Sequence, residues 1–347
     1  MTIIYFVLIL GLIIFIHELG HFIFAKRNGV YCYEFSLGMG PKIYSFKRKN
    51  DETIYSIRLF PIGGYVQMAG EEIEADENIP VKKRLQSKTI WQRFKIVVAG
   101  ALNNFILGIL LLFLIGIFYG SPETKPYISE ADSNYNAYKV GIRDGDLIKK
   151  INGKKIYTID DALLEFELID EGASIKFTVE KKDKEIKEIT VIPSKVEGED
   201  GEESYVYGIS LTNEIDKGFF NAIKYSFNKF VSIYRSMVKI VVNLFTGNLG
   251  MNSLSGPVGI YNVIGEQAKI GFENVLFLTA YISINVGFVN LIPFPAFDGG
   301  RALFLIIEAI RKKPISAKVE NIIHSIGFIL LMLLILVITV QDIIKLF

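Results

Sequence analysis

The sequence has 347 residues, of which 50% are hydrophobic, and its formal net charge at neutral pH is +1. Its apolar runs are longer than a soluble core needs, so the composition predicts a membrane protein rather than a soluble enzyme. A net charge near zero gives no reason to expect a nucleic-acid partner. The single cysteine excludes an intrachain disulfide and a cysteine-based zinc ribbon.

Residues 2–24 form the first hydrophobic segment, which is long enough to cross a bilayer because a spanning helix needs roughly 20 residues. The segment lacks the basic start and the cleavage site of a signal peptide. It contains a His-Glu-x-x-His motif that runs from His17 to His21. On a helix the two histidines lie one turn apart on the same face, where both can bind one zinc ion, and Glu18 can act as general base beside them.

The chain from residue 26 to residue 95 is polar and basic. Within it, residues 53–60 alternate in hydrophobicity like a strand, residues 61–64 break the alternation and residues 65–68 resume it. This pattern predicts a hairpin or a looped sheet. A second membrane segment follows at about residues 96–119.

The character of the sequence changes at residue 122, where a charged and glycine-punctuated stretch begins and extends to about residue 211. Asn152-Gly153 predicts a tight hairpin turn and Thr158 a helix cap. Residues 174–180 and 185–192 predict two strands around a charged turn. We therefore expect a soluble module inserted between membrane segments.

The stretch from residue 219 to about residue 245 has apolar residues at helical spacing, interrupted by lysines and one arginine. This pattern favours an amphipathic helix at the membrane interface over a membrane span. The alternative is an ordinary helix packed on the soluble module. Membrane segments three and four are expected at about residues 275–293 and 322–344.

The distribution of lysine and arginine predicts the orientation of the chain. Basic residues follow the first and third segments, so the positive-inside rule places both loops in the cytoplasm and the inserted module outside. His17 and His21 then lie late in an inward-running segment, and a third ligand is expected late in another such segment. Asp298 is the only acid at the end of the third segment. Two histidines, one aspartate and a water form a catalytic zinc site with one open position.

Three other polar residues near the predicted membrane segments have more than one interpretation. Asn104 and Asn290 either form hydrogen bonds between helices or serve the site, and His324 is expected at the membrane interface rather than on the metal.

With these motifs the chain resembles the site-2 protease family of intramembrane zinc metalloproteases. It is most similar to the bacterial branch of the regulator of sigma-E protease, in a form with a single PDZ domain. Residues 15–21 resemble the zinc helix of the family, residues 290–301 its Asn-x-x-Pro-x-Pro-x-x-Asp-Gly-Gly-Arg motif and residues 255–260 another signature. Residues 63–71 are similar to its membrane-associated β-hairpin region. Residues 99–105 resemble Ala-Gly-Pro-x-x-Asn-Phe, with an alanine in place of the proline.

The resemblance implies that zinc is the cofactor and that Glu18 is catalytic. The metal ligands that it implies are His17, His21 and Asp298. The substrate-binding residues that it implies are Asn104, Asn290, Gly63, Gly64 and Tyr65.

The substrates implied are transmembrane segments of single-span proteins, such as anti-sigma factors and signal-peptide remnants, after trimming by an upstream site-1-type protease. The PDZ-like module would act as a size filter for them. The location implied is the bacterial cell membrane, with the active site toward the cytoplasmic leaflet, and the lipid bilayer is a partner.

The expected fold is a polytopic α-helical membrane protein with about four transmembrane helices, a membrane-associated β-hairpin region and an inserted PDZ-like α+β domain. The expected divisions are a first membrane half, the PDZ-like domain, the amphipathic helix and a second membrane half, at residues 1–121, 122–212, 213–250 and 251–347. A non-catalytic PDZ-bearing scaffold is the alternative, but a scaffold does not need Glu18. A transporter would call for internal repeats and more spans, and neither is visible.

Overall fold

The computed structural model describes five stretches of the chain, residues 1–71, 78–197, 203–212, 214–250 and 254–345. The chain divides into two compact units, one of residues 1–111 with 251–347 and the other of residues 112–250. The expected boundaries at residues 213 and 251 fall outside the described residues.

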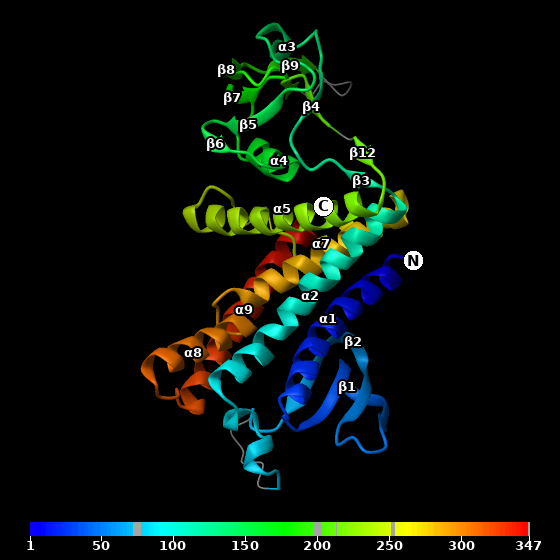
Figure 1. Cartoon of the computed structure of the whole chain (residues 1–347), viewed down its shortest axis with the longest axis vertical. Helices are drawn as coiled ribbons and strands as arrows, with labels where there is room; N and C mark the ends of the chain where they lie inside the picture. Colours follow the sequence, from blue (N-terminus) through cyan, green and yellow to red (C-terminus); the bar gives the residue numbers. More distant parts are fainter. Residues whose placement is uncertain (72–77, 198–202, 213, 251–253, 346–347) are drawn as a thin grey trace. The chain divides into compact units, whose positions relative to one another are not determined.

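Four long apolar helices confirm the predicted fold class. Each is long and apolar enough to cross a membrane, and each coincides with one of the four predicted segments. They are α1 (Thr2–Arg27), α2 (Ile90–Phe118), α7 (Phe272–Leu291) and α9 (Ala317–Ile344) (Figure 1). The division between the two units falls within α2.

Two shorter helices of the first unit, α6 (Pro257–Ile270) and α8 (Asp298–Arg311), were not predicted. The start of α6 is fixed by a buried carboxylate on α9, since Oδ2 of Asp342 accepts hydrogen bonds from the backbone N–H groups of Gly256 and Gly259 at 2.9 and 2.8 Å. These bonds satisfy donors that every helix start leaves free. The start of α8 follows two prolines, which the sequence suggested only as an interruption of the third segment.

Glycine allows α1 and α2 to approach closely. A side-chain carbon on Gly20 would collide with the backbone of Ala99 and lie 3.0 Å from the Cα atom of Gly100. Helices in a bilayer associate largely through such small residues, because lipid gives no hydrophobic driving force between them. This approach brings the histidine face of α1 against the backbone of α2.

A small sheet joins α1 to α2 in the chain. It consists of β1 (Cys32–Lys47) and β2 (Ile54–Met68), which pair antiparallel, and two 3-10 turns, Val81–Lys83 and Leu85–Ser87, follow it. Phe35 of β1 has two partners in β2, Tyr55 and Val66, so the first part of β1 lies between two arms of β2.

Of the two forms expected for this region, the structure has the looped sheet. The two predicted strands are the two arms of β2, and both pair with β1 rather than with each other. The sequence did not predict β1, whose alternation is interrupted by Gly38 and Gly40 at positive φ.

The second unit contains the inserted α+β module. Its four-stranded sheet has the order β6-β5-β7-β8 and carries a core of buried aliphatic residues around Phe177. Its elements are β3 (Ser121–Pro122), β4 (Ile128–Ala131), α3 (Asn136–Lys139), β5 (Leu147–Ile151), β6 (Lys154–Lys155), α4 (Ile159–Glu167), β7 (Ile175–Glu180), β8 (Ile186–Val191), β9 (Ser194–Glu197), β10 (Glu203–Val206), β11 (Ile209–Leu211) and β12 (Ile215–Asp216).

Local signals in this module were predicted correctly. Asn152 and Gly153 both have positive φ and form the turn between β5 and β6. Thr158 caps α4, where it forms a capping box with Asp161.

The amphipathic helix α5 (Phe219–Thr246) also belongs to the second unit. Its lysines contact α4 of the module, with Lys229 2.7 Å from Asp160 and Lys239 2.7 Å from Asp161. The polar side of α5 therefore packs on the module, as the alternative interpretation of the sequence expected. Aromatic and aliphatic residues such as Phe220 and Phe227 stay exposed elsewhere on the helix, and its position at a membrane interface remains a prediction.

Candidate active site

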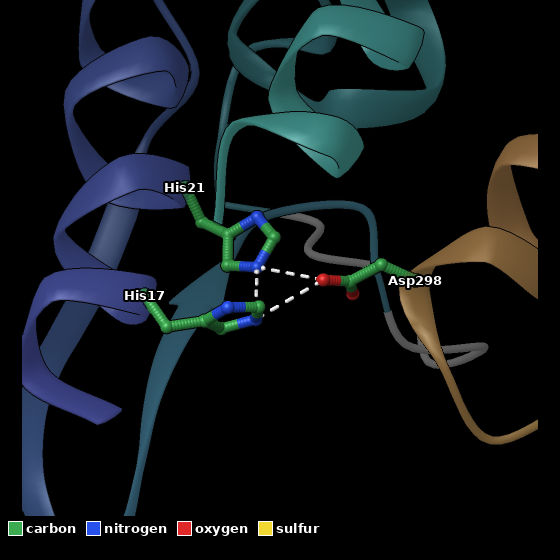
Figure 2. A group of neighbouring side chains, drawn as sticks. All are labelled: His17, His21 and Asp298. Atoms are coloured by element: carbon green, nitrogen blue, oxygen red, sulfur yellow. Dashed lines mark hydrogen bonds and ion pairs between the residues drawn. The ribbon is translucent and has the colours of Figure 1, made fainter. Parts of the chain in front are cut away.

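Figure 2 shows two histidines of α1 and one aspartate of α8 pointing toward a common centre. Nε2 of His17 lies 3.1 Å from Oδ2 of Asp298, and Nε2 of His21 lies 3.2 Å from the same oxygen. The two Nε2 atoms are 3.2 Å apart. Each histidine is only 9% exposed, so three atoms with lone pairs face one another at a largely buried position.

This geometry fits a zinc ion. Zinc bonds to nitrogen and oxygen are about 2.0–2.2 Å long, so two ligands of a tetrahedral ion lie about 3.3 Å apart. The three separations here are within a few tenths of an ångström of that spacing. Oδ2 of Asp298 is buried, and among the described residues it has no hydrogen-bond donor. A cation between the three atoms would satisfy all of them.

The loop between α7 and α8 determines where Asp298 lies. The helix α8 begins at Asp298, and Ala296 just before it has a φ of 91°. A side-chain carbon on Gly299 or Gly300 would collide with carbonyl groups of the same loop. The backbone N–H of Ala296 donates to Nδ1 of His324 on α9 at 3.1 Å. The Asp-Gly-Gly sequence thus allows a tight turn into α8, and α9 holds that turn.

The helix α2 contacts both histidines on the ring edges that face away from Asp298. Nδ1 of His21 lies 2.8 Å from the carbonyl oxygen of Ile96, and Nδ1 of His17 lies 3.2 Å from Nδ2 of Asn104. Asn104 is completely buried. Its side chain therefore lies behind a candidate metal ligand, and the substrate-binding role implied by the resemblance stays a prediction.

Glu18 lies beside this cluster, against a glycine of β2. A side-chain carbon on Gly64 would come within 3.1 Å of Cγ of Glu18 and 2.9 Å of the carbonyl oxygen of Ser36. Among the described residues, no hydrogen bond or ion pair is formed by the carboxylate of Glu18. The carboxylate is therefore available to exchange a proton with a water molecule.

The cluster opens into a cavity of about 670 Å³. Its walls come from α1, the second arm of β2, α2, the start of α8 and α9. The lining residues are His17, Glu18, His21, Tyr65, Val66, Met68, Glu71, Leu85, Ile96, Val97, Ala296, Phe297, Asp298, Arg301, His324, Ser325, Phe328 and Ile329.

The sequence-predicted substrate residues have different positions in the first unit. Gly64 and Tyr65 lie on the second arm of β2, next to Glu18 and the cavity respectively. Gly63 precedes them with a φ of 94°. Asn290 is half-buried near the end of α7 and is not among the residues that line the cavity.

Three titratable lining residues were not predicted for the site: Glu71, Arg301 and His324. Arg301 forms an ion pair with Glu71 across the cavity wall. Arg301 belongs to the Asp-Gly-Gly-Arg motif, which could have indicated it. His324 is far away in the sequence and was expected only at the membrane interface.

A buried carboxylate on β1 fixes the orientation of Tyr65. Glu34 accepts hydrogen bonds from Ser56 at 2.5 Å and Arg58 at 2.8 Å, and it pairs with Lys42 at 2.8 Å. Arg58 also contacts the hydroxyl of Tyr65 at 2.5 Å. Burial alone would raise the pKa of Glu34, but these partners lower it from 4.5 to about 2. Their contribution to stability is complete above pH 4.5 and is lost as the pH falls toward 2.

Comparisons with known proteins agree with this geometry. The sequence profile of Peptidase family M50 matches residues 5–334. The chain is 34% identical to the regulator of sigma-W protease RasP of Bacillus subtilis, over 100% of this chain and 99% of that protein. Zinc metalloprotease RasP of Bacillus licheniformis is also 34% identical over the same shares, and that of Geobacillus kaustophilus is 33% identical over 100% and 98%.

These matches confirm the predicted family, the predicted enzyme class and zinc as the cofactor. They cover the candidate metal site, the four membrane helices and the inserted module alike. The chain therefore belongs to peptidase family M50, the site-2 family of intramembrane zinc metalloproteases.

Proposed function

We propose that this protease cuts inside the transmembrane segments of single-span membrane proteins whose outer domains have already been removed. The observation that carries the proposal is the position of Glu18 and of two of the three candidate metal ligands on α1, a helix apolar enough to cross the membrane. The relative in Bacillus subtilis is named a regulator of sigma-W protease. That name supports anti-sigma factors as one substrate class, with signal-peptide remnants as another.

Each residue of the site has a specific role in this proposal. His17, His21 and Asp298 hold the metal. When bound, zinc supplies a Lewis acid that polarises the scissile carbonyl and lowers the pKa of water. Glu18 takes a proton from the attacking water and passes it to the leaving nitrogen as the peptide C–N bond breaks. The products are a carboxylate on one fragment and an amine on the other.

A transmembrane substrate must unwind locally before it can be cut, because a helix uses its carbonyl groups in its own hydrogen bonds. An open strand edge can replace those bonds by strand addition. The second arm of β2 pairs with β1 on one side, and no described strand pairs with its other side. Tyr65, Val66 and Met68 of this arm line the cavity, so we propose this arm as the site where the unwound segment binds.

The orientation of the protein is also part of the proposal. Lys26 and Arg27 end α1, and Arg311 ends α8 and is followed by Lys312 and Lys313. Basic residues at these positions favour the cytoplasm for both loops. The active site then lies toward the cytoplasmic leaflet of the bacterial membrane, and the PDZ-like module lies outside.

The module would act as a size filter that excludes substrates with bulky outer domains, so an upstream site-1-type protease would act first. Its attachment to α5 supports this role. The ion pairs of Lys229 and Lys239 with α4 hold the module on the helix. The exposed apolar side chains of α5, such as Phe220 and Phe227, suit a helix lying in the membrane interface.

Replacing Glu18 by glutamine removes the proton acceptor and keeps the shape of the side chain. We expect zinc content to stay at the wild-type level while cleavage of a trimmed single-span substrate falls by at least about 10²–10⁴-fold. Metal analysis and gel-based cleavage in detergent would measure the two effects. The exposed Glu130→Gln is the matched control and should cut normally. Wild-type cleavage by Glu18→Gln would show that another group is the base.

Replacing Asp298 by alanine removes one of the three proposed ligands. Loss of an outer partner of a metal ligand typically weakens metal binding by about 10–100-fold, so loss of the ligand itself should cost at least as much. Competition with a zinc chelator would measure the affinity. The control is Asp170→Ala at an exposed position of the module. Unchanged zinc affinity in Asp298→Ala would contradict the proposed ligand set.

Replacing the module, residues 122–211, by a short flexible linker should abolish size selection. We expect untrimmed substrate to be cut at a rate approaching that of trimmed substrate, because the filter is gone while the metal cluster belongs to the other unit. Cleavage of the two substrates side by side would measure the ratio, and zinc content would show that the membrane core is intact. If a zinc-loaded variant still excludes the untrimmed substrate, another part of the protein must act as the size filter.

A further inference from the structure

Asn104 has an environment that the proposed chemistry leaves unexplained. It is a polar residue in the middle of α2, it is 0% exposed, and its amide lies 3.2 Å from Nδ1 of His17. In the structure, Nδ2 of Asn104 faces the ring of His17, and Oδ1 is buried without a partner among the described residues. A buried polar atom without a partner calls for an explanation.

The contact between His21 and α2 shows which ring nitrogen of this histidine carries the proton. Nδ1 of His21 lies 2.8 Å from the carbonyl oxygen of Ile96. A carbonyl oxygen only accepts hydrogen bonds, so Nδ1 of His21 must carry the proton. The lone pair of Nε2 is then free, and Nε2 is the atom that faces Asp298. One contact with α2 thus sets the tautomer that can bind a metal.

His17 has the same requirement, because its Nε2 also faces Asp298. With the lone pair of Nε2 on a metal, Nδ1 must be protonated and must find an acceptor. The side chain next to it is Asn104, which offers an acceptor only through Oδ1. The oxygen and nitrogen of an amide are nearly equal in size and exchange places by a half-turn of the amide group. That half-turn gives the unpartnered oxygen a donor and gives His17 its acceptor.

We propose that Asn104 is a positioning residue for the metal site. Its Oδ1 accepts a hydrogen bond from Nδ1–H of His17 and thereby fixes the tautomer and the ring orientation in which Nε2 binds zinc. The inference rests on the proposed ligand set of His17, His21 and Asp298. It gives Asn104 no contact with the substrate.

The contacts around Asn104 separate this role from simple helix packing. The backbone carbonyl of Asn104 accepts a hydrogen bond from Ser283 of α7 at 2.9 Å, which does not involve its side chain. The neighbouring Asn103 provides a side-chain link between α2 and α1, because its Nδ2 donates to the carbonyl oxygen of Ile16 at 3.2 Å. Asn103 is therefore a matched control that loses a bond between the same two helices and leaves His17 untouched.

The experiment measures zinc affinity of the full-length protein by chelator competition for four forms: wild type, Asn104→Leu, Asn104→Asp and Asn103→Leu. Leucine keeps the size of the side chain and removes the acceptor, so zinc affinity should fall by about 10–100-fold. Aspartate keeps an acceptor oxygen, so Asn104→Asp should stay within a few-fold of wild type. Asn103→Leu should bind zinc as wild type does. At saturating zinc, KM should be unchanged in all variants that fold.

Several results would overturn the inference. Wild-type zinc affinity in Asn104→Leu would show that His17 needs no hydrogen-bond acceptor from Asn104. An equal loss of zinc affinity in Asn104→Leu and Asn104→Asp would show that the side chain acts through packing. A raised KM with unchanged zinc affinity in Asn104→Leu would indicate that Asn104 contacts the substrate. Including Asp298→Ala separates a failure of the ligand set from a failure of the role of Asn104. Retention of zinc by Asp298→Ala would contradict the ligand set itself. If Asp298→Ala loses zinc while Asn104→Leu keeps it, only the role of Asn104 fails.

A second measurement needs no variant and stays informative if Asn104→Leu does not fold. The chain has three histidines, so nitrogen NMR of the zinc-loaded protein with ¹⁵N-labelled histidine should resolve each ring. We expect His17 and His21 to be protonated at Nδ1. An unprotonated Nδ1 on His17 would contradict the inference directly.

Discussion

The structure of the first unit depends on the cost of placing two imidazoles and a carboxylate among apolar helices. Polar groups in such surroundings are tolerated only when each has a partner, and charged groups only when they are paired or bind a metal. Three helices meet this condition together. The helix α1 provides His17 and His21, α8 provides Asp298, and α2 contacts the outer edge of each imidazole ring.

Close backbone approach makes this arrangement possible. Gly20 brings α1 against α2, and a side-chain carbon on Gly100 would lie 2.7 Å from the ring of His17. Gly64 brings the second arm of β2 against Glu18 in the same way. A larger residue at Gly100 or Gly64 would press on a side chain of the site, and one at Gly20 would collide with the backbone of α2.

The sequence allowed the local features of the site to be predicted, because they depend on short spacings. The grouping of His17, Glu18 and His21 is predicted by their spacing of one helical turn. The turn at Asn152 in the module is predicted by the Asn-Gly pair itself. Asp298 is distant in the sequence, so its prediction needed either the orientation of the third segment or the resemblance of residues 290–301 to a family motif. The start of α8 at that residue was not predicted.

Contacts between distant residues could not be predicted. The hydrogen bond between His17 and Asn104 joins residues 87 positions apart, and nothing in the spacing of α2 indicates which face meets α1. The pairing of both arms of β2 with β1 depends on where the chain folds back at Gly38 and Gly40. His324 reaches the cavity only because α9 packs against the loop before α8. Such contacts are set by tertiary packing rather than by local pattern.

The most direct test of the central claim is X-ray absorption at the zinc edge of the purified, zinc-loaded protein. The proposed site predicts nitrogen and oxygen ligands at about 2.0–2.2 Å, with the outer-shell scattering of two imidazoles and no sulfur. A sulfur ligand at about 2.3 Å, or scattering from fewer than two imidazoles, would contradict a metal site built from His17, His21 and Asp298.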